Sequence, residues 1–189
     1  MAAPGDAALA AFLAAHRDQP LSYAPVGCTL AGQAPAGMVL DRACVELGTG
    51  AGCEAAARQA LRSWQMFALP WMRVFPTAAP LAVDTCVAVA VRACGWWWNN
   101  VCRIVAVVDE PGRFGFVYGT TRAHAESGEE LFLVETGADQ RVRFVIVAIS
   151  RPRHPLARLA RPLVRALQGR FRRDATQAMA RAVSGSATP

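Results

Sequence analysis

The chain has 189 residues, of which 53% are hydrophobic and 18% charged, so it can fill one sizeable core and is unlike a disordered protein. Its formal net charge is +6, and all 20 basic residues are arginine. Arginine side chains bind phosphate and carboxylate groups. A high-GC genome, however, also favours arginine over lysine through its codons. The positive charge alone therefore does not indicate nucleic-acid binding.

The six cysteines include no C-x-x-C pair, so the sequence indicates neither a zinc ribbon nor a thioredoxin-type site. A chain this long and apolar does not need disulfides, and we expect reduced thiols in the core. The first 15 residues lack a basic start and carry Asp6, unlike a signal peptide, and no apolar run is long enough to span a bilayer. We therefore expect a soluble, cytoplasmic protein without a metal or cofactor.

The N-terminal half predicts two helices and one strand. Residues 1–22 are expected to be an extension with a short helix over Ala7–His16, capped by Asp6, and the Pro- and Gly-rich stretch to Gly37 is expected to be a loop. A strand is predicted over Met38–Leu47. Apolar residues at helical spacing then predict a helix over Gly52–Phe67, which ends before Pro70.

From Trp71 to Ser150 the apolar residues alternate, which is typical of strands. The predicted strands are Met72–Phe75, Thr85–Ala93, Val101–Val108, Arg113–Gly119, Leu131–Thr136 and Arg141–Ile149. Turn residues between them are Asn99-Asn100, Glu110-Pro111-Gly112, Ser127-Gly128 and Gly137-Ala138-Asp139. Short turns between successive strands indicate an antiparallel meander.

A long amphipathic helix closes the predicted fold. Its apolar stripe consists of Leu156, Leu159, Leu163, Leu167, Phe171, Ala175, Ala178 and Ala182. Pro155 suits a first turn, and Pro162 is expected to kink the helix or to start its main part. The sequence predicts an α+β fold in which a curved antiparallel sheet wraps around this helix, with a single domain over 23–183 and a frayed tail over 184–189. A cavity between sheet and helix is expected to bind a small apolar ligand.

Particular segments resemble the family called domain of unknown function 1990, or uncharacterised protein family 0548. They are Phe114-Gly115-Phe116-Val117-Tyr118-Gly119-Thr120 and the run from His124 to Phe132, with similar residues from Tyr23 to Met179. The resemblance implies the helix-grip fold of birch-pollen-allergen-like and START-like proteins, and it implies no particular function.

Polar residues gather at the end of the predicted strand Arg113–Gly119 and in the segment before Leu131–Thr136: Tyr118, Thr120, His124, Glu126, Glu129 and Glu130. Four interpretations stay open: a hydrated hairpin loop, contact with a ligand, acid–base catalysis by His124 and Glu130, or a metal site. Alternation places Phe114, Phe116, Tyr118 and Thr120 on one strand face, with glycines opposite that permit close approach.

Two further features allow two interpretations each. The run Trp96-Trp97-Trp98 is expected to form either an aromatic gate or membrane-facing tip, or a hydrophobic plug at the end of the sheet. Arg103 is either exposed or turned inward, where it would pair with Glu130, with Glu135 or with a ligand carboxylate.

The leading hypothesis is a helix-grip protein that binds a small apolar or amphipathic molecule. The expected ligand contacts are Trp64, Phe67, Trp71, Arg103, Tyr118, Thr120, His124, Glu130, Phe132 and Leu167. The alternatives are an enzyme that uses His124 and Glu130 on an apolar substrate, and an interaction module that uses the tryptophan tip or the arginine-rich helix. That helix could contact anionic lipid headgroups, whereas nucleic acid is not an expected partner, and the sequence identifies no protein partner.

Overall fold

Seven antiparallel strands form one curved sheet in this computed structural model, which describes residues 2–185. The strand order is β1-β7-β6-β5-β4-β3-β2, so every strand after β1 lies beside its neighbour in sequence and β1 closes the sheet against β7. The strands are β1 (Val39–Thr49), β2 (Met72–Phe75), β3 (Cys86–Ala93), β4 (Trp96–Glu110), β5 (Arg113–Thr120), β6 (Glu126–Thr136) and β7 (Arg141–Pro152). The predicted antiparallel meander is confirmed.

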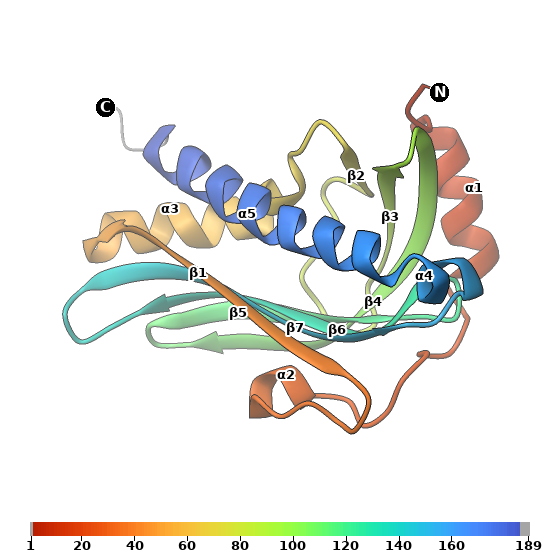
Figure 1. Ribbon diagram of the computed structural model, residues 1–189. Coiled ribbons are helices and arrows are strands. Elements are labelled where there is room, and N and C mark those ends of the chain that lie inside the picture. The colour runs from red at the N-terminus through yellow and green to blue at the C-terminus, as the bar shows by residue number, and fades with distance from the viewer. Residues whose placement is uncertain (1, 186–189) are drawn as a thin grey trace.

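Helices cover both faces of the sheet. They are α1 (Asp6–His16), α2 (Cys28–Ala31), α3 (Gly50–Arg62), the 3-10 turn η1 (Gln65–Phe67), α4 (Pro155–Leu159) and α5 (Arg161–Gly185). The long helix α5 crosses the concave face, while α2 lies beyond the opposite face (Figure 1). The predicted helix-grip arrangement is therefore confirmed, with α5 as the gripped helix.

Two of the predicted turns are wrong. Asn99 and Asn100 lie within β4, because the chain reverses earlier, at Cys94 and Gly95, which both have positive φ. Ser127 and Gly128 lie within β6, where they pair with β7. Asn and Gly favour turns locally, but the ladder to a neighbouring strand overrides that preference here.

The last helical segment divides in two. His154 caps α4, which ends at Leu159, and α5 begins at Arg161, immediately before Pro162, so this proline lies in the first turn of the main helix. The break rotates Leu159 out of the predicted apolar stripe, and its side chain is 85% exposed. Of the predicted tail, Ser184 and Gly185 belong to α5, and residues 186–189 lie outside the described residues.

The main core lies between the concave face and the helices α3, η1 and α5. Trp64, Phe116, Phe132 and Phe144 are almost completely buried there, and Phe171 of α5 packs on Phe67 and Phe132. The shared strand face predicted for Phe114, Phe116 and Tyr118 is the inward one, because all three belong to this core. On the outer face, a side chain at Gly119 would collide with Tyr23, which explains the glycine.

The N-terminal helix packs on the outer face of the sheet. Leu9 is fully buried against β3, and Trp97 lies beside it with Phe12 and Leu13. Helix α1 begins at Asp6 with Gly5 as its N-cap, so the predicted Asp6 cap is wrong by one residue.

The cysteine prediction holds in part. All six cysteines, which lie within the described residues, are free thiols. Only Cys28 and Cys102 are buried, and Cys44 and Cys94 are exposed. Between residues 2 and 185, no helix combines the length and hydropathy that crossing a bilayer requires.

Candidate ligand cavity

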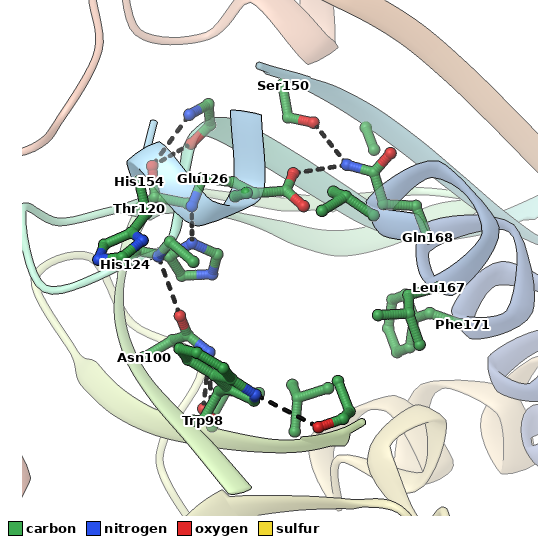
Figure 2. A pocket seen from close by; sticks show the side chains of 18 of the residues that line it. Trp98, Asn100, Thr120, His124, Glu126, Ser150, His154, Leu167, Gln168 and Phe171 are labelled. Atoms are coloured by element: carbon green, nitrogen blue, oxygen red, sulfur yellow. Dashed lines mark hydrogen bonds between the residues drawn. The ribbon is translucent and has the colours of Figure 1, made fainter. Parts of the chain in front are cut away.

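A cavity of about 330 Å³ lies between the sheet and the first turns of α5 (Figure 2). Apolar side chains from β2 and the residue before it, β3, α4 and α5 form most of its wall: Trp71, Met72, Val89, Val91, Leu156, Leu163, Val164, Leu167 and Phe171. Polar side chains from β4, β5, β6 and β7 gather on the sheet side. The exposed lining residues Cys94, Trp98, His154, Leu156 and Leu163 mark its mouth.

Six of the ten expected contact residues line this cavity: Trp71, Tyr118, Thr120, His124, Glu130 and Leu167. Trp64, Phe67 and Phe132 lie instead in the packed core, where the centroid of the Phe67 ring is 5.8 Å from that of Trp64 and 5.6 Å from that of Phe132. The Trp64 indole donates its hydrogen bond to the Ala79 carbonyl, so its polar group is already used within the core.

Arg103 has to be removed from the expected cavity contacts. Its neighbours Cys102 and Ile104 point into the core, so strand alternation turns Arg103 to the outer face. Its guanidinium donates to the backbone carbonyls of Arg17 and Gln19, 2.7 and 3.0 Å away. It therefore holds the N-terminal extension against the sheet and pairs with neither Glu130 nor Glu135.

One row of side chains crosses the concave face from β1 to β5. The register aligns Asp41 with Ala148, Ala148 with Glu130, and Glu130 with Tyr118. Because Ala148 is small, space remains between the two acidic residues, and this space belongs to the cavity. Above Asp41, helix α5 contributes Arg165 in a two-pronged ion pair and Arg172 at 3.3 Å.

Glu130 is the acidic side chain of this row that faces the cavity. Burial raises the pKa of its carboxyl to about 7, although a hydrogen bond from the Tyr118 hydroxyl, 2.9 Å away, opposes the shift. The same surroundings raise the pKa of the Tyr118 phenol well above its usual value, so the hydroxyl keeps its proton. Near neutral pH, Glu130 can therefore exchange a proton with a bound molecule.

A second polar group lies nearer the mouth. Glu126 accepts a hydrogen bond from the Gln168 amide, which also donates to Ser150, and burial raises the pKa of Glu126 (Figure 2). The His124 ring accepts a hydrogen bond at Nδ1 from the Glu126 amide, and burial lowers its pKa to about 4. At neutral pH His124 is thus uncharged, with its remaining proton on Nε2.

Glu129 points away from this chemistry. It is almost fully buried on the outer face, where its carboxylate accepts four hydrogen bonds, from the Tyr23 hydroxyl, the Gly27 amide, and the amide and hydroxyl of Thr29. These bonds fasten the 22–32 segment, including α2, to the sheet. The interpretation of the acidic cluster as a hydrated loop is therefore wrong for Glu129 and Glu130, because both lie within β6, where Glu129 is buried and Glu130 partly buried.

Several cavity residues were not among the expected contacts: Trp98, Asn100, Ser150, Gln168 and Arg172. For Gln168 a signal existed, since it follows Leu167 and precedes Phe171 on the helix predicted to cover the sheet. No local signal marks Ser150 or Asn100, because their position depends on strand register. Within residues 2–185, no group of three or more His, Cys, Asp or Glu side chains is placed to hold a metal.

Comparison with known families gives a match over most of the chain. The family described as Domain of unknown function (DUF1990) matches residues 22–178. A UPF0548 protein of Deinococcus radiodurans is 38% identical over 189 residues, covering 95% of this chain and 96% of the relative. A UPF0548 protein of Dictyostelium discoideum is 32% identical over 159 residues, covering 78% and 74%.

Solved structures share the fold at low sequence identity. The ZhuI aromatase/cyclase of Streptomyces sp. R1128 has a TM-score of 0.57 at 14% identity, covering 78% of this chain and 94% of that chain. Human STARD10 has a TM-score of 0.52 at 10% identity, covering 97% and 81%. A START superfamily protein of Mycobacterium smegmatis has a TM-score of 0.50 at 11% identity, covering 78% and 97%. At these identities the similarity concerns the fold alone.

Proposed function

We propose that this chain, which belongs to the DUF1990 domain family, binds a small apolar or amphipathic molecule between the sheet and α5. The observation that carries this proposal is the cavity of about 330 Å³, whose wall is mostly apolar and whose polar groups converge on one side. Its volume lies at the lower end of the range for small-molecule sites. The ligand is therefore small, with an apolar body against Leu167 and Phe171 and any polar group toward Tyr118 and Glu130.

Native mass spectrometry of the protein purified from its own host tests this proposal directly. A reproducible small companion, released by gentle denaturation, would identify the ligand. A protein that carries no companion, and whose melting temperature is unchanged across a panel of lipids and hydrophobic metabolites, would contradict the proposal.

Filling the cavity is expected to abolish binding. In Ala148→Phe the new ring would occupy the space between Asp41 and Glu130, so the affinity for the small neutral fluorophore 1-aminoanthracene should fall by at least about tenfold. Fluorescence titration measures the affinity, and circular dichroism checks the fold. The matched control is Ala34→Phe in an exposed loop, which should bind as the unchanged protein does. Equal affinity for both variants would place the probe outside this cavity.

A second candidate function is catalysis, favoured by the single observation that Glu130 combines a pKa of about 7 with a position in the cavity wall. In this role Glu130 would move a proton on the bound molecule, and Tyr118 would orient the carboxyl through its hydrogen bond. The ZhuI aromatase/cyclase shows that an enzyme can be built on this fold, by analogy only.

The catalytic candidate has its own test. With the companion molecule identified by mass spectrometry, Glu130→Gln should still bind it but should convert it at least about 100-fold more slowly, since general acid–base catalysis contributes about this much. Conversion by the unchanged protein should show an inflection near pH 7. An unaltered molecule after prolonged incubation would leave binding as the function.

A further inference from the structure

Large apolar side chains are exposed around the mouth of the cavity. On the helical side, Leu156 is 56% exposed, Leu159 85% and Leu163 43%; on the strand side, Trp96 is 60% exposed and Trp98 43%. Leu156, Leu163 and Trp98 line the cavity, so both groups border the same opening. We call these five residues the apolar rim. Exposed apolar side chains concentrated at one place usually mark a surface that is covered in use.

Arginines surround the helical part of this rim. The stretch from Arg151 to Arg173 contains eight arginines and no aspartate or glutamate. Arg165 and Arg172 are paired with Asp41, and Arg170 with Asp174. Arg151, Arg153, Arg158 and Arg161 are exposed and form no ion pair with any residue in the described part of the chain.

Three of these arginines converge on a groove beside the rim. Arg151 at the end of β7, Arg158 of α4 and Arg161 of α5 line a hollow of about 290 Å³, which shares Ser150, Val164 and Gln168 with the ligand cavity. Such a groove suits anionic oxygens, because guanidinium groups bind phosphate in two-pronged geometry. The apolar rim and the anion-binding groove thus lie side by side at one end of the molecule.

We propose that this end of the molecule docks on the surface of an anionic lipid bilayer, with the apolar rim in the headgroup–acyl boundary and Arg151, Arg158 and Arg161 on lipid phosphates. Leucine and tryptophan beside arginine is the combination that interfacial membrane segments use. Docking would also place the mouth of the cavity against the membrane, where an apolar molecule could enter without crossing water.

The charge of this surface argues against a second copy of the chain as its partner, and its apolar residues argue against an RNA. A second copy of the chain that docked symmetrically through the same face would place two clusters of unpaired arginines against each other, and these would repel. An RNA would satisfy the arginines but would leave Leu159 and Leu163 without apolar contacts.

The first test is co-sedimentation with vesicles. The protein should bind vesicles of phosphatidylcholine with roughly 30 mol% phosphatidylglycerol at least about tenfold more strongly than pure phosphatidylcholine, and the difference should shrink in high salt. Lipids brominated near the headgroup should quench tryptophan fluorescence, because Trp96 and Trp98 would enter the bilayer. Equal binding to both vesicle types, or no quenching by bound lipid, would overturn the proposal.

Variants locate the surface. Leu159→Glu should weaken vesicle binding at least about tenfold, since it puts a charge at the centre of the apolar rim. Its control, Leu30→Glu, changes a 43% exposed leucine on α2 and should bind vesicles normally. Arg158→Gln with Arg161→Gln should weaken binding about 20-fold, whereas Arg42→Gln with Arg113→Gln, which removes the same charge elsewhere, should change it about twofold. Similar losses in a variant and its control would contradict this placement.

The outcome is separable from that of ligand binding. Leu159 does not line the cavity, so Leu159→Glu should bind 1-aminoanthracene as the unchanged protein does. Loss of vesicle binding with retained dye binding supports docking by this surface. Vesicle binding that persists in Leu159→Glu refutes this docking surface and leaves the ligand cavity unaffected.

Discussion

Glu129→Ala is expected to destabilise the folded protein by about 4 kcal/mol, the largest stability effect that we predict for a single side chain. Removing the carboxylate leaves the buried amide of Thr29 and the partly buried amide of Gly27 without their acceptor, and each unsatisfied buried donor costs about 1–3 kcal/mol. The Tyr23 hydroxyl also loses its acceptor, and because burial raises the pKa of Tyr23, the phenol cannot compensate by ionising. Urea unfolding followed by circular dichroism measures the loss.

The control for this change is Glu135→Ala, on the same strand and the same alternation phase but only partly buried. Its cost should stay below about 1 kcal/mol, as for other partly exposed polar residues. Proteolysis should also distinguish the two variants, because only Glu129→Ala is expected to release the 22–32 segment for cleavage. A loss below about 1 kcal/mol in Glu129→Ala would show that water replaces the carboxylate and that this segment is not fastened by it.

Glu130→Gln is expected to stabilise the protein progressively as the pH rises. The folded pKa of Glu130, about 7, lies above the ordinary value of 4.5, so the folded state holds a proton that the unfolded chain releases. The stabilisation that this proton gives the folded state is fully present below pH 4.5 and is lost as the pH rises through 7. Glutamine cannot ionise, so the stability of the variant relative to the unchanged protein should rise with pH, by at most about 3 kcal/mol.

His124 makes the free energy of unfolding depend on pH in the opposite direction. Its folded pKa, about 4, lies below the ordinary 6.5, so the unfolded chain binds the extra proton and stability is lost as the pH falls through this window. In the unchanged protein the slopes of His124 and Glu130 oppose each other between about pH 4.5 and 6.5. Glu130→Gln removes one of them, so its own stability should rise more steeply with pH than that of the unchanged protein.

Unfolding free energies at a series of pH values check this prediction. The control is Glu110→Gln, which makes the same replacement at an exposed carboxyl and shows the effect of the amide itself. A pH-independent difference between Glu130→Gln and the unchanged protein would mean that water solvates Glu130 in the cavity. The catalytic candidate would then lose the observation that favours it.

The amino-acid sequence alone determined the order and type of most elements. The period of apolar residues changes from 3.6 to 2 after Trp71, and β2 and the start of β5 lie where alternation placed them. Alternation also placed Tyr118 and Thr120 on one face of β5, and both line the cavity. These predictions succeed because burial on one face imposes a short-range pattern that each strand carries by itself.

Strand alternation also contains information on which side of the sheet several polar side chains face, and our sequence-based prediction did not use it. Glu130 shares its phase with Phe132, and Glu129 has the opposite one, so their separation into a cavity residue and an outer-face anchor follows from β6 alone. The same argument applied to Cys102 and Ile104 turns Arg103 outward. The tryptophan run follows this rule too, with Trp97 packed beneath α1 and Trp96 and Trp98 on the other face.

Only the tertiary structure decided how the cavity wall is assembled. Asp41, Ala148, Glu130 and Tyr118 form one row because four strands pair in a particular register, which no local pattern encodes. The pairing of Asp41 with Arg165 joins residues that are 124 positions apart. The pKa of Glu130 follows from the same assembly, since it depends on how completely distant segments exclude water from one carboxyl group.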